Sequence, residues 1–216
     1  MSLAYRAALG FVIGALVLGS SPARADLQSD IDQAVAILER MPPRAIPEDV
    51  AKKAHGFAIL NLFKAAAGFS LGGGKGVLVA RTDNGWSAPL GIGGGGVGFG
   101  LQIGIKVDEL VFALNTPKAV EALAKGNFAI GGDISVAFFP WGRTGSVGVT
   151  PQAAISAFGN SQGLFAGLSL EGSMVAVRAG DNAEFYGKAV TSKEVLSGSV
   201  APPAGASKLL ELLSKY

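Results

Sequence analysis

The stretch Val97–Val107, with the sequence VGFGLQIGIKV, decides the fold class of this chain. Apolar residues occupy every second position, and glycine or a polar residue stands between them. A strict period of two is typical of a β-strand, whose successive side chains point to opposite faces. One face of this strand is nearly bare of side chains. Because glycine inside a strand is costly, we expect another element or a partner to approach that face closely.

Further apolar segments on both sides of this strand predict a sheet with many strands. Gly, Asn and Ser residues separate them, as is typical of strands joined by turns. The predicted strands are Phe57–Phe63, Gly76–Arg81, Asp108–Asn115, Phe128–Phe138, Ala153–Phe158, Leu164–Glu171 and Met174–Arg178. Glycine makes up 32 of the 216 residues without a three-residue repeat, which excludes a collagen-like chain.

Helical patterns precede, interrupt and follow these strands. Their boundaries carry N-cap residues, first-turn prolines and closing glycines. The predicted helices are Asp26–Arg40, Pro47–Ala54, Thr116–Gly126, a short one after the capping box Thr191–Glu194, and the amphipathic Ser207–Tyr216. We therefore predict an α+β fold, with a large glycine-rich antiparallel sheet or partly closed barrel, flanking N- and C-terminal helices and one inserted helix.

The N-terminal segment predicts an exported protein. Arg6 precedes an apolar run from Ala7 to Gly19, and an A-x-A site ends at Ala25. This is the pattern of a cleaved signal peptide over residues 1–25, and the run is short for an uncleaved membrane anchor. The rest divides into a domain over 26–200 and a flexible linker with the terminal helix over 201–216. We expect a periplasmic or secreted protein, and not a lipoprotein, because the chain has no cysteine.

Charge and composition exclude several functions. Removing residues 1–25 takes Arg6 and Arg24 from the 18 basic side chains and leaves 16, against 16 acidic ones. A formally neutral chain does not indicate nucleic-acid binding. Without cysteine and with one histidine, His55, the sequence shows neither a zinc site nor a nucleophile and base set. We predict no enzymatic activity and no cofactor.

Two glycine motifs resemble phosphate-binding loops but stand in the wrong context. Gly91-x-Gly93-x-x-Gly96 matches the dinucleotide fingerprint, which must open a helix, whereas here it opens a predicted strand. Gly72–Gly76 contains Lys75, but it lacks the spacing, the Ser/Thr and the following helix of a phosphate loop. We interpret it as a bulged turn with an exposed lysine. His55 is interpreted as a residue at the end of a short helix.

The segment Phe138–Arg143 places consecutive aromatic residues beside an arginine. Tryptophan and arginine together suit a membrane interface, where the indole ring lies at headgroup level and the guanidinium meets phosphate. The alternative is that Phe138 continues the inward face of a strand and Trp141 covers the end of the barrel.

Several stretches together resemble the SYLF family, also called the Ysc-type actin-binding or DUF500 domain. They follow the family in order from about Ala51 to Leu196. The matching stretches are AHGFAI (54–59), KAAAGF (64–69), GVLVAR (76–81), GWSAP (85–89), GGGVGFGLQIG (94–104), GLFAGLSLEG (163–172) and FYGK (185–188). The resemblance implies lipid association rather than a reaction, because eukaryotic members bind phosphoinositides, partly through an amphipathic helix before the domain, and some bind actin filaments.

Two departures limit what this resemblance implies. The helix Asp26–Arg40 lacks a basic face for anionic lipids, and an exported bacterial protein would not meet actin. We therefore expect a lipid-binding module that contacts an anionic phospholipid or membrane surface. The alternative is a structural or protein-interaction domain of the cell envelope. The candidate lipid contacts are Lys75, Arg81, Lys106, Phe139, Trp141 and Arg143.

Overall fold

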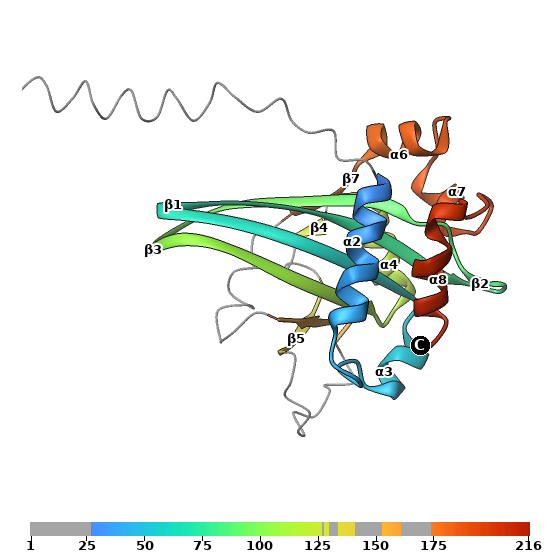
Figure 1. The fold of residues 1–216 in the computed structure, drawn as a ribbon, viewed down its shortest axis with the longest axis horizontal. Coiled ribbons are helices and arrows are strands. Elements are labelled where there is room, and N and C mark those ends of the chain that lie inside the picture. The colour runs from blue at the N-terminus through green and yellow to red at the C-terminus, as the bar shows by residue number, and fades with distance from the viewer. Residues whose placement is uncertain (1–26, 127, 130–133, 141–152, 161–173) are drawn as a thin grey trace, which may run out of the picture.

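The computed structural model describes residues 27–126, 128–129, 134–140, 153–160 and 174–216. Within its strands only the backbone is described at residues 64–71, 96–106, 108, 128–129, 138 and 140. Figure 1 shows a curled sheet with helices packed against both of its faces. This arrangement confirms the predicted α+β class. The predicted signal peptide (1–25) and the predicted strand Leu164–Glu171 lie outside the described residues.

The sheet is organised around one long two-stranded ribbon. Strand β1 (Gly56–Thr82) pairs antiparallel with β3 (Leu90–Leu114), from Gly56 opposite Leu114 to Leu78 opposite Leu90. The predicted strand Val97–Val107 is the middle of β3. Four predicted strands are thus parts of two long ones. The glycine-rich stretches were interpreted as turns between strands, but the chain remains extended through them.

The predicted bulged turn at Gly72–Gly76 is wrong. These residues stay in β1 and pair in register with Ile92–Gly96 of β3. The irregularity lies instead between Ala67 and Phe69, where β1 advances from 67 to 69 while β3 retreats from 103 to 99. Because the difference is two residues, the faces on which paired side chains lie are not exchanged.

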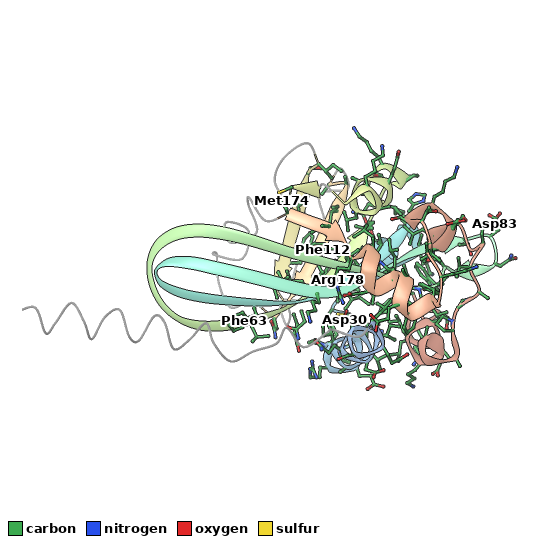
Figure 2. The ribbon with its side chains drawn as sticks, turned by 90° about the horizontal axis from the view of Figure 1, so that it is seen from above. Asp30, Phe63, Asp83, Phe112, Met174 and Arg178 are labelled. Carbon is green, nitrogen blue, oxygen red and sulfur yellow. The ribbon has the colours of Figure 1, made fainter. Side chains whose placement is uncertain are left out.

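The ribbon bends back on itself in its middle. Figures 1 and 2 show β1 and β3 running out from the helices and returning. The two ends of β1 then lie side by side, since Arg81 N–H donates to the His55 carbonyl at 2.8 Å. Glycine is required there, because a Cβ at Gly56 would lie 2.7 Å from the Val79 carbonyl oxygen and one at Gly76 would overlap the Ile59 carbonyl. We call the protruding middle, residues 63–74 and 94–107, the arm.

Five shorter strands complete the sheet, which has the order β2-β1-β3-β6-β5, with β7 pairing to β3 and β4 to β7. They are β2 (Gly85–Trp86), β4 (Phe128–Ala129), β5 (Val136–Pro140), β6 (Ile155–Gly159) and β7 (Met174–Val177). One pair of this mainly antiparallel sheet is parallel, that of β5 with β6. A parallel pair needs a long connection, which the residues between Pro140 and Ile155 supply.

The first helical layer packs on the odd-numbered side chains of β1. Phe57, Ile59, Val77 and Val79 are buried in one cluster with α2 (Leu27–Arg40), α3 (Glu48–Lys53) and α8 (Ser207–Leu213). The predicted flexible linker lies just before α8. It contains a single 3₁₀ turn, Ala204–Ala206, and the Gln28 side chain donates to the Gly205 carbonyl at 3.2 Å.

The second layer packs on the even-numbered side chains. Ala58, Leu60, Leu78 and Ala80 are buried with α4 (Pro117–Lys125) and α7 (Ser192–Leu196). The predicted caps are present. Thr116 accepts from the Ala119 N–H, Gly126 closes α4 with φ 75°, and Thr191 forms a capping box. Because successive side chains of β1 point to opposite faces, this one strand contributes residues to both core clusters.

One helix, α6 (Ala179–Tyr186), was not predicted from the sequence. It has little apolar periodicity, and its buried residue is Asn182. All described members of both core clusters lie between Leu27 and Leu213. A chain that starts at Asp26 therefore keeps the complete described core.

Candidate functional site

Two of the predicted contact residues border the arm. Lys75 is exposed and pairs in register with Gly93, while Lys106 pairs in register with Lys64. Next to the paired lysines stand two exposed apolar side chains, Phe63 and Val107, which are also in register. Their relative exposures are 49% and 52%, whereas large apolar residues at the helix-covered end of the ribbon are buried. Phe63 is labelled in Figure 2.

The arm itself is uncharged beyond these lysines. No charged residue occurs between Lys64 and Lys75 or between Asp83 and Lys106. A long ribbon segment of apolar and glycine residues thus stands between basic residues. This order of charges and apolar residues is typical of segments that meet a membrane interface.

Arg81, also predicted as a phosphate contact, has partners within the protein. Its guanidinium donates to the carbonyls of Ala51 and Ala54, at 3.2 and 3.1 Å, where α3 ends. It also lies over the Trp86 ring, 4.3 Å from its centroid. Arginine at a helix C-terminus satisfies carbonyls that lack a partner within the helix. The structure thus gives Arg81 a role in anchoring α3 to the sheet.

The aromatic segment divides between the described and undescribed parts of the chain. Phe139 lies in β5, partly buried, and stacks on Phe158 with ring centroids 5.2 Å apart. Its ring packs against the cluster beneath α2. Trp141 and Arg143 lie outside the described residues.

A buried ionic group joins α2 to α6 and was missed by the sequence analysis. Asp30 of α2 is 3% exposed and forms an ion pair with Arg178. Arg178 also binds Asp181 through its Nε at 2.6 Å. Burial raises the pKa of Asp30, and the guanidinium opposes only part of this rise. A lone acidic residue on a helix gives no signal of a partner 148 positions away.

The dinucleotide-like motif serves this same group. Asn182 receives the Gly91 N–H at 2.7 Å and donates to the Gly91 carbonyl at 3.0 Å. A Cβ at position 91 would lie 3.1 Å from the Asn182 side-chain oxygen. A Cβ at Gly93 would lie 2.9 Å from Arg178 Cδ. Gly91 and Gly93 are therefore explained by close packing against Asn182 and Arg178, and the segment remains a strand.

The remaining buried polar side chains of the described part are also used structurally. The Ser87 hydroxyl receives the Ala80 N–H at 3.0 Å and donates to the Ala88 carbonyl at 2.9 Å. The Ser156 hydroxyl receives a bond from the Asn115 amide at 2.9 Å. Among the described residues there is no group of three or more acidic or histidine residues that could hold a metal.

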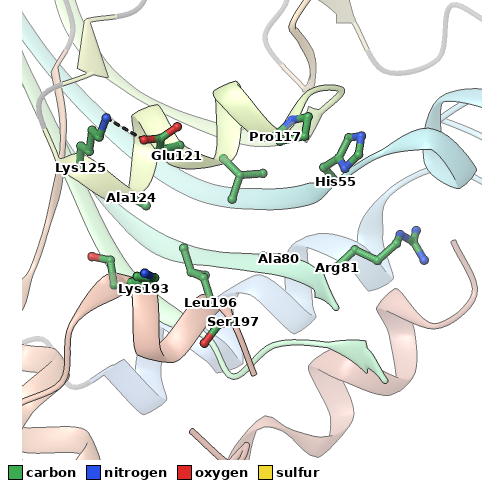
Figure 3. A pocket seen from close by; sticks show the side chains of 12 residues that line it. His55, Ala80, Arg81, Pro117, Glu121, Ala124, Lys125, Lys193, Leu196 and Ser197 are labelled. Atoms are coloured by element: carbon green, nitrogen blue, oxygen red, sulfur yellow. Dashed lines mark ion pairs between the residues drawn. The ribbon is translucent and has the colours of Figure 1, made fainter. Parts of the chain in front are cut away.

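A pocket of about 600 Å³ opens between α4 and α7, over the joined ends of β1 (Figure 3). Its apolar lining includes Ala80, Val120 and Leu196, and its polar lining includes His55, Lys125 and Lys193. His55 follows α3 directly, as predicted, and is exposed. Sequence analysis did not find this pocket, because its walls come from three distant segments.

The helix α2 covers the sheet rather than standing free. Its apolar residues Leu27, Ile31, Ala34 and Ile37 are buried. An amphipathic helix must expose its apolar face to enter a membrane surface, whereas the apolar face of α2 is buried in the core. Within the described residues, no helix combines the length and apolar character that crossing a bilayer requires.

Fold and site together define the class of protein: an α+β domain with a curled, glycine-rich sheet between two helical layers, in which the buried polar groups hold elements together. The sequence comparison then gives the family. A family model described as Ysc84, a Las17-binding protein actin regulator, matches residues 95–216. The chain belongs to this family, also known as the SYLF family, and the resemblance seen in the sequence is confirmed.

Curated relatives support the assignment over most of the chain. SH3 domain-containing YSC84-like protein 1 of Homo sapiens is 40% identical over 209 residues, which cover 91% of this chain and 61% of that protein. LAS seventeen-binding protein 3 of Saccharomyces cerevisiae is 41% identical over 176 residues, covering 79% of this chain and 38% of that protein. The chain therefore spans less than two thirds of the length of these relatives.

Proposed function

We propose that this protein is a non-catalytic module that binds an anionic phospholipid surface through its arm. The observation that carries this proposal is the exposed pair Phe63 and Val107, next to the register pair Lys64 and Lys106. Exposed large apolar residues on a monomer mark interaction sites when they gather in one place. Here they gather where the ribbon leaves its helical cover.

The energies of such a contact are sufficient for reversible binding. Burial of apolar surface contributes about 25 cal/mol per Å². Each lysine close to an anionic surface adds about 1 kcal/mol. Because the chain from Asp26 is formally neutral and only a few lysines border the arm, we expect the apolar part to dominate and the salt dependence to be weak. Lys75, Lys106 and the Trp141–Arg143 segment remain the candidate contacts in this proposal.

Vesicle co-sedimentation tests the proposal. The chain from Asp26 would be mixed with phosphatidylglycerol and with phosphatidylcholine vesicles. We expect binding that Phe63→Asp weakens about tenfold or more, because it places a carboxylate against acidic headgroups. Lys64→Gln combined with Lys106→Gln should weaken binding to phosphatidylglycerol alone. Lys208→Gln, an exposed change on α8, is the matched control.

A Trp141→Ala, Arg143→Ala double variant would run in parallel to test the aromatic segment. Loss of binding in this variant with no loss in Phe63→Asp would move the contact from the arm to that segment. If the unaltered chain bound neither vesicle, the lipid proposal would be wrong.

Protein binding is the second candidate function. The yeast relative is named for binding LAS seventeen, and the matching family model is described as an actin regulator. On this alternative the arm would contact a protein, and for an exported chain an envelope protein. Export and a periplasmic or secreted location remain predictions from residues 1–25. Pull-down with immobilised chain from the same cellular fraction, compared with Phe63→Asp, distinguishes this alternative from vesicle binding.

A further inference from the structure

We infer that the pocket between α4 and α7 is a binding site for a small amphiphilic anion, with one apolar tail and one carboxylate or phosphate head. This site is separate from the arm. It is built on His55, Ala80 and Arg81, at the two joined ends of β1, whereas the arm is the middle of that strand. The proposal therefore goes beyond membrane contact by the arm and does not depend on it.

The size and the lining of the pocket suit such a ligand. Its volume, about 600 Å³, lies within the range of about 300–1,000 Å³ that is common for small-molecule sites. In Figure 3, α4 and α7 form opposite walls and β1 lies between them. Ala80, Val120, Ala124 and Leu196 supply apolar surface against which a hydrocarbon tail can pack.

The charges around the pocket favour an anionic head. The lining contains one carboxylate, Glu121, and Lys125 already pairs with it at 2.8 Å. Lys193 reaches the pocket from the opposite wall and has no ion pair among the described residues. Its neighbour Glu194 does not line the pocket, since its carboxylate accepts the Thr191 N–H and hydroxyl, each at 2.7 Å. The pocket therefore carries surplus positive charge.

A serine hydroxyl adds a donor beside Lys193. Ser192 and Ser197 belong to the same wall and line the same pocket. The Ser197 hydroxyl already donates its one proton to the Glu194 carbonyl at 3.2 Å and lies 2.8 Å from the Ser199 hydroxyl, so the donor offered to a ligand is the Ser192 hydroxyl. Charge-assisted hydrogen bonds from lysine, supported by hydroxyls, are the contacts that carboxylate and phosphate oxygens accept best.

The protein contains a natural reporter for this site. Arg81 lines the pocket and lies over the Trp86 ring, 4.3 Å from its centroid. The chain has two tryptophans, so Trp141→Phe leaves Trp86 as the only one. An anion that enters near Arg81 changes the field at the indole and thus its fluorescence.

Calorimetric titration of the chain from Asp26 with octyl phosphate, below its micelle concentration, tests the inference. Inorganic phosphate supplies the head alone, and octyl glucoside supplies the tail with a neutral head. We expect saturable one-to-one binding of octyl phosphate, at least about tenfold tighter than either of the others, since both contacts contribute. In the Trp141→Phe background, the fluorescence of Trp86 should change with the same affinity.

Two variants and one control place the ligand. Lys193→Gln should weaken octyl phosphate binding about tenfold, and Ala124→Glu should abolish it by adding a second carboxylate. Lys118→Gln, on an exposed position of α4 outside the pocket, should bind normally. Thermal unfolding of each variant verifies that it is folded, and Lys193→Gln alters only an exposed side chain.

Equal affinities for octyl phosphate and octyl glucoside would overturn the inference, as would equal affinities of Lys193→Gln and Lys118→Gln. Vesicle binding separates the two sources of such an anion. A loss in Lys193→Gln would assign the ligand to membrane lipids. Unchanged vesicle binding, with octyl phosphate binding weakened, would assign it to a soluble amphiphile.

Discussion

The same two strands behave differently at their two ends. Where β1 and β3 run between the helices, Phe57, Leu78 and Phe112 have no more than 1% of their surface exposed. In the arm, Phe63 and Val107 expose about half of theirs. Backbone pairing continues through both regions. The comparison teaches that pairing alone fixes the path of the ribbon, while the helices determine which parts of it are core.

The role of glycine also differs between positions along the ribbon. At the helix-covered end, Gly76 sits where β1 passes its own first half, and Gly91 faces Asn182. At Gly73, in the arm, the nearest atom to an added Cβ is the Gly94 carbonyl oxygen at 3.7 Å, an ordinary contact. Glycine is therefore a steric requirement at positions 76 and 91, and also at Gly74 and Gly94 at the base of the arm, where a Cβ would lie 2.7 Å from the Asn61 carbonyl oxygen and 2.9 Å from the Met174 carbonyl oxygen. At Gly73 it is a matter of backbone freedom.

The largest expected effect comes from Gly76→Ala. The new Cβ would overlap the Ile59 carbonyl and lie 2.9 Å from Leu60 Cα, so the two halves of β1 must separate. We expect a loss of more than about 4 kcal/mol in the free energy of unfolding. Urea unfolding followed by circular dichroism measures it.

The matched control is Gly73→Ala on the same strand. It should change stability by less than about 1 kcal/mol, because alanine there meets no close atom and restricts the unfolded chain. If both substitutions lowered the free energy of unfolding equally, glycine would have the same role at both positions, and the comparison would be wrong.

An intermediate effect is expected from truncating two phenylalanines of the ribbon. Phe112→Ala removes a ring that is 1% exposed and should cost about 3–5 kcal/mol. Phe63→Ala should cost less than about 1 kcal/mol, since its ring is half exposed. The difference in urea midpoints measures how sharply the core ends. A comparable loss at Phe63 would show that the arm is covered in solution.

The smallest effect concerns the pH dependence caused by Asp30. Burial raises the pKa of this carboxyl above the model-peptide value of 3.8, so the folded chain holds its proton more tightly than the unfolded chain. The stability contributed by this proton is present below pH 3.8 and is lost as pH rises through the raised pKa.

Asp30→Asn removes this titration. The unfolding free energy of the unaltered chain minus that of the variant should fall as pH is raised from about 3 to about 7. A difference that rose with pH would mean that Arg178 outweighs burial. Glu211→Gln, on the exposed face of α8, serves as the control with a similar loss of one carboxylate.

Much of the fold could be predicted because its signals are local. Alternation in Val97–Val107, the cap at Thr116 and the capping box at Thr191 each depend on neighbouring residues, and the structure contains all three. The length of the strands could not be predicted. Runs such as Gly72–Gly76 are ordinary turn signals, and only the pairing partner Ile92–Gly96, itself mostly glycine, keeps them extended.

Less of the site could be predicted, because its parts meet across long distances in sequence. The sequence pointed to lysines, and the ribbon does place Lys75 and Lys106 at the borders of the arm. It also pointed to Arg81, but gave no sign that its guanidinium binds the carbonyls that end α3. The pocket beside α7 and the Asp30–Arg178 pair depend on tertiary contacts for which a single sequence carries no pattern.

The continuous ribbon also has a consequence for the time course of folding. Gly56 and Leu114 are 58 positions apart in sequence, yet the pairs between them and the Asp83–Asn84 turn follow one another with two interruptions, one between Leu78 and Arg81 and one near Ala67. If pairing starts at that turn, each new pair closes only a short additional loop. No single step then has to bear the entropic cost of closing a long loop. We therefore expect zipper-like kinetics, with the bulge near Ala67 as the slowest point and the docking of α2 and α8 as the last event.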